Sequence, residues 1–355
     1  MSADRKCLLV RTDASESIGT GHVMRCLALA QAWQRPGSRV QFALGMTANG
    51  LETRLAAEGV AIAQISAPPG SEEDAAQTSD LARSANAGWV VLDGYHFGAN
   101  YQRAIKKAGL MSLCVDDYGH ADHYSADVVL NQNSYADEAT YCRREPYTRL
   151  LLGSTYALLR REFSRWRGWR RAISPVGGHI LVTFGGTDPN NVTLAVIKAL
   201  GLLNSTGFHV RVVVGAANPN RELLAEEASR GHCRVELVKA ATDMPDLMAW
   251  ADLAISAAGS TCWELAFMGV PMVTIIQAEN QRFIAENLAQ SGVALNAGWH
   301  HAFRGPVLAE IVSRLVGAPE MRRRMSGLGQ AMVDGFGAQR VAETLGDFEF
   351  QPRSA

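Results

Sequence analysis

Residues suited to chemistry gather after the first apolar run of the chain. Asp13 ends the run "CLLVRTD", and His22 follows Gly19 and Gly21 in "SIGTGHVMRCLALA" (17–30). Glycines that lead into a helix free backbone amides at its start, where an anionic group binds favourably. The helix dipole there favours a neutral imidazole, and a neutral imidazole in a cleft is a competent general base. The spacing alone fits a general base and an ordinary polar helix start equally well.

Two common nucleotide loops are excluded at this position. No Gly-Lys-Ser/Thr follows the glycines, so the segment is not an ATP-binding P-loop. Met24 stands where a dinucleotide fingerprint needs its third glycine, and the next apolar run, "VQFALG", offers no acidic residue for a ribose. Asp13 would orient His22, bind a sugar hydroxyl or simply form the turn into the helix, and chemistry alone favours the turn.

A second glycine loop occurs in the other half of the chain. In "FGGTDPNN" (184–191), Gly185 and Gly186 permit a close approach of the backbone, and Asp188 precedes a proline that opens a helix. This pattern suits a phosphate cradle and a tight turn equally.

The segment "SAAGSTCWELAFMGVP" (256–271) has the same geometry. Gly259 and Ser260 lie where amides are free at a helix start, and Glu264 lies one turn further, where it can accept hydrogen bonds from a ribose diol. Thr261 and Glu264 also have the spacing of a capping box, which the pattern alone slightly favours.

Polar residues follow two further apolar runs. Tyr95 lies in "VLDGYHF" and Asn280 in "QAENQ", both at expected strand ends, where they line a cleft or merely form polar loops. The sequence has no His-Glu-x-x-His, no Asp-x-Asp of metal-dependent sugar transferases and no Gly-x-Ser-x-Gly elbow. We therefore expect neither a metal nor a cofactor.

The elements that must position these residues alternate between strand and helix. Such alternation is typical of βαβ units on a parallel sheet. It lapses at the basic, Trp-bearing segment 160–178 and then resumes. We predict an α/β protein of two Rossmann-like, doubly wound domains, 1–165 and 172–345, with ligands at the carboxyl ends of the strands. The tail from 305 to 346 is expected to be helical and part of the second domain.

Composition limits the class of protein. The chain has 355 residues, 34 Lys and Arg against 35 Asp and Glu, and 47% apolar residues. This balance argues against a nucleic-acid partner held by bulk charge. Six scattered cysteines without a Cys-x-x-Cys pair indicate reduced thiols. No run approaches the roughly 20 apolar residues of a membrane span, and the start does not look like a signal peptide, so we expect a cytoplasmic protein.

Four motifs together resemble one family. They are "RTDASESIGTGHVMRCLALA", "LLGSTYALLRREF", "FGGTDPNNVT" and "ISAAGSTCWELAFMGVPMVTI…ENQ". In this order, over most of the chain, they are similar to the UDP-2,4-diacetamido-2,4,6-trideoxy-β-L-altropyranose hydrolases of pseudaminic acid biosynthesis, a pathway that serves flagellin or surface-polysaccharide glycosylation. The second half also resembles the UDP-GlcNAc transferase that acts on lipid-linked muramyl-pentapeptide, a glycosyltransferase of GT-B fold.

The resemblance implies a role for each motif. It implies a UDP-sugar substrate, with UDP held by the second half and the sugar under the first loop, where His22 matches the proposed base. Residues implied to bind UDP are Gly185, Gly186, Gly259, Ser260 and Glu264; residues implied to bind the substrate are Asp13, Gly21, Arg25, Tyr95 and Asn280. Water would attack the anomeric carbon with inversion while UDP leaves.

Other activities remain open from the sequence. A glycosyltransferase of the same architecture would pass the sugar to an acceptor, and the fold alone does not separate the two. No amphipathic basic membrane-docking segment stands out, which favours a small soluble substrate; the Arg- and Trp-rich stretch 160–171 is the one feature against this interpretation. A nucleotide-sugar-binding protein without turnover and a hydrolysing UDP-sugar 2-epimerase are further alternatives. The sequence does not indicate an oligomeric state.

Overall fold

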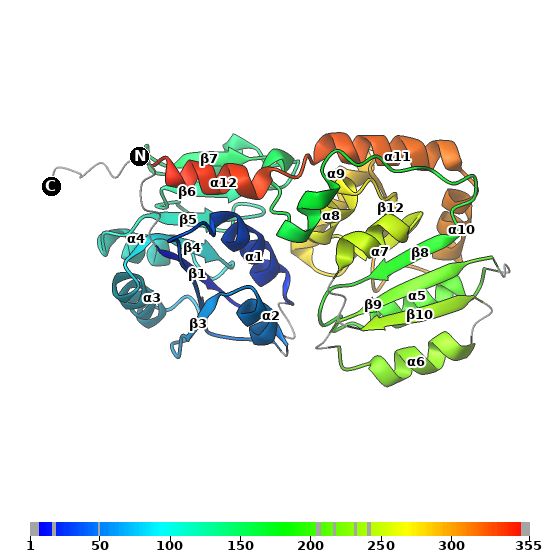
Figure 1. The fold of residues 1–355 in the computed structure, drawn as a ribbon, viewed down its shortest axis with the longest axis horizontal. Coiled ribbons are helices and arrows are strands. Elements are labelled where there is room, and N and C mark those ends of the chain that lie inside the picture. The colour runs from blue at the N-terminus through cyan, green and yellow to red at the C-terminus, as the bar shows by residue number, and fades with distance from the viewer. Residues whose placement is uncertain are drawn as a thin grey trace.

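The computed structural model describes residues 7–15, 19–48, 50–203, 207–215, 218–230, 233–239 and 243–348. These residues form two α/β halves that lie side by side (Figure 1). Residues 16–18 of the opening motif lie outside the described residues.

The first half contains a parallel sheet of seven strands, in the order β3-β2-β1-β4-β5-β6-β7. Its strands are β1 Cys7–Thr12, β2 Val40–Leu44, β3 Ala61–Gln64, β4 Ala87–Asp93, β5 Ser112–Val115, β6 Val128–Asn131 and β7 Arg149–Leu152. Its helices are α1 Gly21–Trp33, α2 Leu51–Ala57, α3 Glu72–Ser84 and α4 Ala99–Lys107, with short 3-10 turns η1 Glu138–Tyr141, η2 Ser154–Tyr156 and η3 Arg161–Trp166.

The second half repeats this plan with six parallel strands, in the order β10-β9-β8-β11-β12-β13. Its strands are β8 His179–Thr183, β9 His209–Val214, β10 Arg234–Lys239, β11 Leu253–Ala257, β12 Met272–Ile276 and β13 Ala294–Trp299. Its helices are α5 Val192–Leu200, α6 Arg221–Arg230, α7 Met244–Trp250, α8 Thr261–Phe267, α9 Arg282–Gln290, α10 Gly305–Val316 and α11 Pro319–Met332, with η4 Glu279–Gln281. The predicted α/β class with two Rossmann-like halves is confirmed.

Apolar side chains cover both faces of each sheet, which explains the continuous apolar strand runs. One cluster packs α1 and residues 338–348 against one face of the first sheet, and a second cluster lies on the other face under α3 and α4. Two large clusters flank the second sheet in the same way. These cores fix the loops at the strand ends, and those loops carry the polar residues.

The strand orders create a crevice in each half. In the first sheet the chain moves outward from β1 to β3, then returns to place β4 on the other side of β1. Loops after β1 and β4 therefore diverge, and the gap between them is where ligands bind in doubly wound sheets. The second sheet has the same reversal between β8 and β11. Both crevices coincide with motifs that the sequence singled out.

The last helix differs from the sequence prediction. Helix α12, Gly337–Gly346, returns to the first half, where Val341 and Leu345 join the cluster beside α1. The indole of Trp89 donates a 3.0 Å hydrogen bond to the carbonyl of Leu345. Helix α12 thus belongs to the core of the first half, where it packs against α1 (Figure 1). The predicted boundary between 165 and 172 stays a prediction.

Residues 160–178, the joining segment, connect the two halves and are anchored to the second one. Arg171 donates hydrogen bonds to the carbonyls of Met248, Ala251 and Met268, and its burial lowers the guanidinium pKa to about 10, against an opposing effect of Asp252. Within the described residues, no helix combines the length and apolar character that crossing a bilayer requires.

Candidate active site between the two domains

His22 lies on the first turn of α1, directly after the glycine loop. Its Nδ1 is 2.7 Å from Oδ1 of Asp93, the last residue of β4. An Nδ1–H that donates to a carboxylate fixes the ring orientation and leaves Nε2 as the acceptor. Nε2 of His22 has no hydrogen-bond partner among the described residues, and the side chain is 11% exposed. His22 therefore has the arrangement of an oriented general base.

Asp93 is the hub of this arrangement. Arg25 lies on the same face of α1 as His22, three residues on, and donates from Nε and Nη2 to the two carboxylate oxygens, at 2.7 Å each. Burial alone would raise the pKa of Asp93, but the Arg25 guanidinium, helped by His22, holds that pKa well below its usual range. Asp93 is thus ionised beside His22, although it is fully buried.

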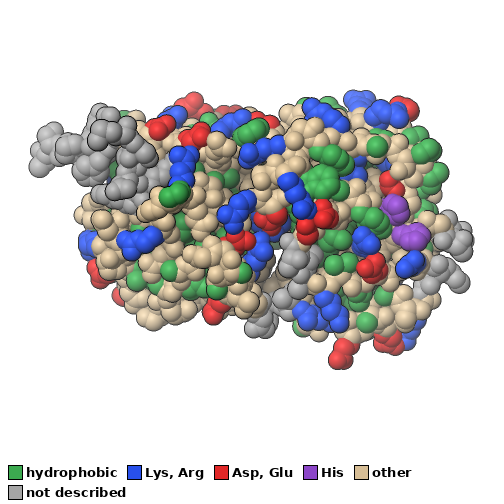
Figure 2. Space-filling model, in the orientation of Figure 1, with side chains coloured by type: hydrophobic (Ala, Val, Ile, Leu, Met, Phe, Trp, Pro, Cys, Tyr) green, Lys and Arg blue, Asp and Glu red, His purple; other side chains and the backbone are tan. Residues whose placement is uncertain are grey.

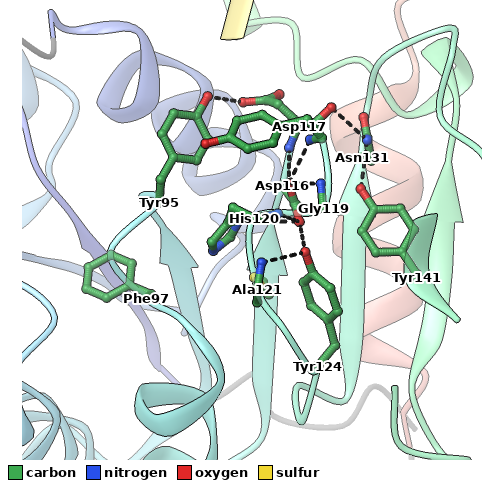
Figure 3. Close-up of polar contacts among 12 residues, drawn as sticks. Tyr95, Phe97, Asp116, Asp117, Gly119, His120, Ala121, Tyr124, Asn131 and Tyr141 are labelled. Atoms are coloured by element: carbon green, nitrogen blue, oxygen red, sulfur yellow. Dashed lines mark hydrogen bonds and ion pairs between the residues drawn. The ribbon is translucent and has the colours of Figure 1, made fainter. Parts of the chain in front are cut away.

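Arg25 joins Asp93 to a second buried carboxylate, Asp117. Its Nη1 donates to both oxygens of Asp117, at 2.8 and 3.0 Å. Asp117 also accepts a 2.7 Å hydrogen bond from the hydroxyl of Tyr95 and one from the amide of Asn133. Figure 3 shows the Tyr95 hydroxyl directed at Asp117. Three loops of the first sheet therefore meet in one network of ionised and hydrogen-bonded groups.

The network extends across the domain boundary. The Asn280 amide, on η4 of the second half, donates a 3.0 Å hydrogen bond to the Tyr95 hydroxyl. The Tyr95 ring also lies edge-on to His22, with centroids 5.2 Å apart. Four residues that the sequence singled out separately, His22, Arg25, Tyr95 and Asn280, are thus brought together.

The glycine loops of the two halves face each other at the same place. A Cβ built on Gly186 would lie 2.9 Å from the Thr20 hydroxyl, and one built on Gly21 would lie 3.8 Å from the Ser260 hydroxyl. Gly185 has φ +81°, which favours glycine. The loop after β8 and the loop after β11 therefore lie against the loop that precedes His22.

Glu264 has a specific partner in the joining segment. Its Oε1 accepts hydrogen bonds from Nε and Nη2 of Arg160, at 3.1 and 2.9 Å. Burial raises the pKa of Glu264, and Arg160 opposes that rise. The capping box that the sequence slightly favoured is not formed, because α8 begins at Thr261 and no side chain caps it. Oε2 of Glu264 accepts no hydrogen bond within the described part of the chain, so it remains an acceptor for a ligand.

Asp13 is not the residue that orients His22, and that suggestion from the sequence is wrong. Its Oδ1 accepts hydrogen bonds from Arg11 and from the amides of Gly45 and Met46, at 2.7 to 2.9 Å. Asp13 is 2% exposed, and its carboxylate holds the ends of β1 and β2 together. The sequence did not distinguish Asp13 from Asp93, because both follow apolar strands and only the sheet order decides which one faces α1.

A second carboxylate, Asp116, shapes the loop that carries Asp117. Its Oδ1 accepts the backbone N–H groups of Asp117, Tyr118 and Gly119, at 2.5 to 3.0 Å, and its Oδ2 accepts the Tyr124 hydroxyl (Figure 3). Burial would raise the pKa of Asp116. The His120 imidazole, then the Tyr124 hydroxyl and the Tyr118 N–H, outweigh burial and lower that pKa to about 2. Neither Asp116 nor Asp117 was predicted from the sequence as a site residue. The signal was present, since "DDYGH" follows the apolar run of β5.

No group of three or more His, Cys, Asp or Glu side chains is placed to hold a metal ion in the described ranges. The six cysteines are free thiols, of which Cys142 alone is exposed. Cys26 lies inside the site, where its thiol is 3.2 Å from Asp93, and burial raises its pKa.

Comparison with known proteins agrees with this architecture. The model of the glycosyltransferase family 28 C-terminal domain matches residues 179–325. The chain has the GT-B fold. Its structure is similar to MurG of Acinetobacter baumannii, with a TM-score of 0.64 and 17% identity over 97% of this chain and 100% of that one. It is also similar to Anabaena HepE, solved in complex with UDP-glucose, with a TM-score of 0.62 and 16% identity over 96% of this chain and all of HepE.

Curated relatives match over much of this GT-B chain. The spore coat polysaccharide biosynthesis protein SpsG of Bacillus subtilis is 28% identical over 64% of this chain and 67% of its own length. The UDP-2,4-diacetamido-2,4,6-trideoxy-β-L-altropyranose hydrolase of Campylobacter jejuni is 26% identical over 80% of this chain and 97% of its own. The resemblance inferred from the motifs is therefore confirmed.

Proposed function

We propose that this protein hydrolyses a UDP-sugar, and that the substrate is UDP-2,4-diacetamido-2,4,6-trideoxy-β-L-altropyranose. The products would be UDP and the free diacetamido-trideoxy-altrose. The observation that carries the proposal is the 2.7 Å contact between His22 and Asp93 at the junction of the two domains. The similarity to the Campylobacter hydrolase over most of both chains supports the choice of substrate.

In the proposed reaction His22 activates the attacking water. Nε2 takes a proton from the water while its oxygen forms a bond to the anomeric carbon, and the bond from that carbon to the β-phosphate oxygen breaks. Asp93 accepts the hydrogen bond from Nδ1–H and stabilises the imidazolium that forms. A single displacement of this kind inverts the anomeric configuration. A well-placed general base contributes about 10²–10⁴-fold to the rate.

The second half would hold the leaving UDP. The backbone of Gly185, Gly186, Gly259 and Ser260 forms the loops after β8 and β11, beside His22. Amides at such loops and helix starts stabilise the charge that develops on the leaving diphosphate. The unoccupied Oε2 of Glu264 suits the ribose hydroxyls, with Arg160 holding the carboxylate in place.

The polar network of the first half would receive the sugar. Tyr95 and Asn280 meet where the sugar of a UDP-sugar would lie between the halves, and Gly21 allows the chain to approach it closely. Arg25 is 6% exposed and held by two carboxylates, so its main role in the proposal is to fix Asp93 and Asp117. Asp13 would act only by positioning the strand ends.

The deciding experiment measures UDP release from this UDP-sugar in the presence of EDTA and without an acceptor, while NMR follows the sugar anomer. We expect rapid release with an inverted anomer, and a loss of about 10²–10⁴-fold in His22→Ala with UDP binding retained. His123→Ala is the matched control, because His123 pairs with Glu145 on the surface. Full activity of a folded His22→Ala protein would falsify the role of His22. Release that requires an added acceptor would make the protein a transferase.

A further inference from the structure

A cavity lies where the C-terminal half of α1, η3 and α12 meet. It has a volume of about 180 Å³, well above the roughly 10–15 Å³ that one bound water needs. Its floor is apolar, with Leu159, Phe163 and Ala338, and its wall contains the four arginines Arg35, Arg160, Arg161 and Arg167. Figure 2 shows basic side chains, with acidic ones among them, over the middle of the face that it presents. No acidic residue lines the cavity among those described.

The charges around this cavity do not balance. Arg160 pairs with Glu162 and Glu264, Arg161 pairs with Glu58, and the adjacent Arg54 pairs with the same Glu58 and Glu162. Three carboxylates thus face a group of five guanidiniums. The excess positive charge has no counterpart in the described part of the wall.

The unbalanced positive charge is that of two arginines, Arg35 and Arg167. The Arg35 guanidinium has neither an ion pair nor a hydrogen bond within the described ranges. Arg167 donates only to the Gly335 carbonyl and lies 4.1 Å over the Phe336 ring. Guanidinium groups recognise carboxylate and phosphate oxygens through paired hydrogen bonds, so these side chains suit an anionic ligand.

A buried amide in the wall gives independent evidence for a ligand. Gln31 is 6% exposed, and its Oε1 accepts a 2.7 Å hydrogen bond from the backbone N–H of Arg161. That bond fixes the orientation of the amide, yet its Nε2 has no partner among the described residues. A buried N–H₂ without an acceptor has lost its hydrogen bonds to water and gained none in return, which is unfavourable. A ligand oxygen would supply the missing acceptor.

We propose that this cavity is a second anion site, separate from the UDP site, which takes a small phosphate or carboxylate. The anion would accept hydrogen bonds from Gln31 Nε2 and from the guanidiniums of Arg35 and Arg167, with any short apolar part against Leu159 and Phe163. Phosphate and carboxylate ligands share this chemistry, and the experiment below separates them. The proposal does not depend on which reaction the protein performs.

The test measures the binding of inorganic phosphate and of malonate to the full-length protein by calorimetry, at constant ionic strength and with saturating UDP present. We expect the preferred anion to bind with one site per chain while UDP is bound. Gln31→Glu keeps the Oε1 acceptor and the shape but replaces Nε2 by an oxygen, so it should weaken binding at least tenfold. Arg35→Gln should weaken it severalfold. Arg83→Gln, which removes an exposed arginine on α3, should bind as the wild type does.

Three outcomes overturn the proposal. Displacement of the anion by UDP would place it in the diphosphate site instead. Equal binding by the wild type and Gln31→Glu would mean an adventitious ion only, as would the absence of binding by either probe. Failure of the proposed hydrolase activity is measured separately, by UDP release, so the two hypotheses fail independently. Thermal unfolding of each variant checks that it is folded.

Discussion

Asn280 of the second domain donates a hydrogen bond to the hydroxyl of Tyr95 in the first, across 185 positions of sequence. The same hydroxyl donates to Asp117, which holds Arg25, which in turn holds Asp93 and His22. An uninterrupted series of polar contacts therefore leads from the second domain to the candidate base. This contact depends on the approach of the domains, whereas the rest of the series lies within the first sheet.

The contact between Asn280 and Tyr95 leads to a prediction about substrate binding. Asn280→Ala removes only the bond between the domains, which is worth about 0.5–1.5 kcal/mol. We expect KM for the UDP-sugar to rise roughly 2- to 13-fold, while the unfolding free energy falls by no more than about 1.5 kcal/mol. Asn287→Ala is the control, because it removes another contact between the domains, the 2.5 Å contact to Ser134. If both variants raise KM equally, domain closure in general is responsible and Tyr95 has no special role.

Replacing Asp93 tests the orientation of His22. Asp93→Asn keeps the shape but removes the charge that accepts from Nδ1 and Arg25, so we expect hydrolysis to fall by about 10²–10⁴-fold. Loss of one partner from a buried ion pair also costs about 3–5 kcal/mol of unfolding free energy. Nitrogen NMR of the His22 ring should show a changed tautomer, a signature that a purely structural role would not produce.

Asp13→Asn is the matched control for Asp93. It alters a buried carboxylate of the same sheet that pairs with Arg11 and does not touch His22. We expect a similar loss of stability, with activity per folded molecule close to that of the wild type. Equal loss of activity in both variants would show that the effect comes from destabilising the sheet.

Glu264 should make the protein prefer a ribonucleotide to a 2′-deoxyribonucleotide. If its Oε2 accepts a ribose hydroxyl, the wild type binds UDP more tightly than 2′-deoxy-UDP, and Glu264→Gln reduces that preference along with affinity, by roughly tenfold or more. Glu279→Gln removes an exposed carboxylate of η4 that pairs with Arg282. This variant should leave the affinities for UDP and for 2′-deoxy-UDP unchanged. An undiminished preference for UDP in Glu264→Gln would assign the ribose to another residue. Calorimetry with both nucleotides provides the measurement.

Asp116 should make the first domain sensitive to acid. Its pKa is about 2 in the folded protein, below the ordinary value of 3.8, so its contribution is complete above pH 4 and is lost as the pH falls toward 2. The difference corresponds to about 2 kcal/mol. Asp116→Asn should therefore destabilise the protein at pH 6, measured by urea unfolding. The difference in unfolding free energy from the wild type should narrow as the pH falls from about 4 toward 2. Asp80→Asn, in an exposed pair, should give a small gap at every pH.

The alternation of strands and helices could be predicted from the sequence, because burial on both faces of a parallel sheet requires apolar runs in the strands. Segments such as β4, with "WVVLD", and β12, with "MVTII", show this clearly. The glycine loops could be predicted too, since Gly185 adopts a positive φ, which is unfavourable for residues other than glycine. Helix α12 was assigned to the wrong domain from the sequence, because an amphipathic pattern shows that a helix packs against a core but does not indicate which domain supplies that core.

By itself, the sequence determined which residue types lie at the strand ends: His22 after a glycine loop, two glycine loops in the second half, and Tyr95 and Asn280 beside them. Only the tertiary structure decided the partners. The sheet order, with β4 next to β1, made Asp93 and not Asp13 the partner of His22. The path of the joining segment places Arg160 beside Glu264, so the Glu264 carboxylate pairs with this arginine and does not cap helix α8. Local pattern records burial and backbone conformation, whereas pairing between distant side chains depends on how strands are ordered and domains are docked.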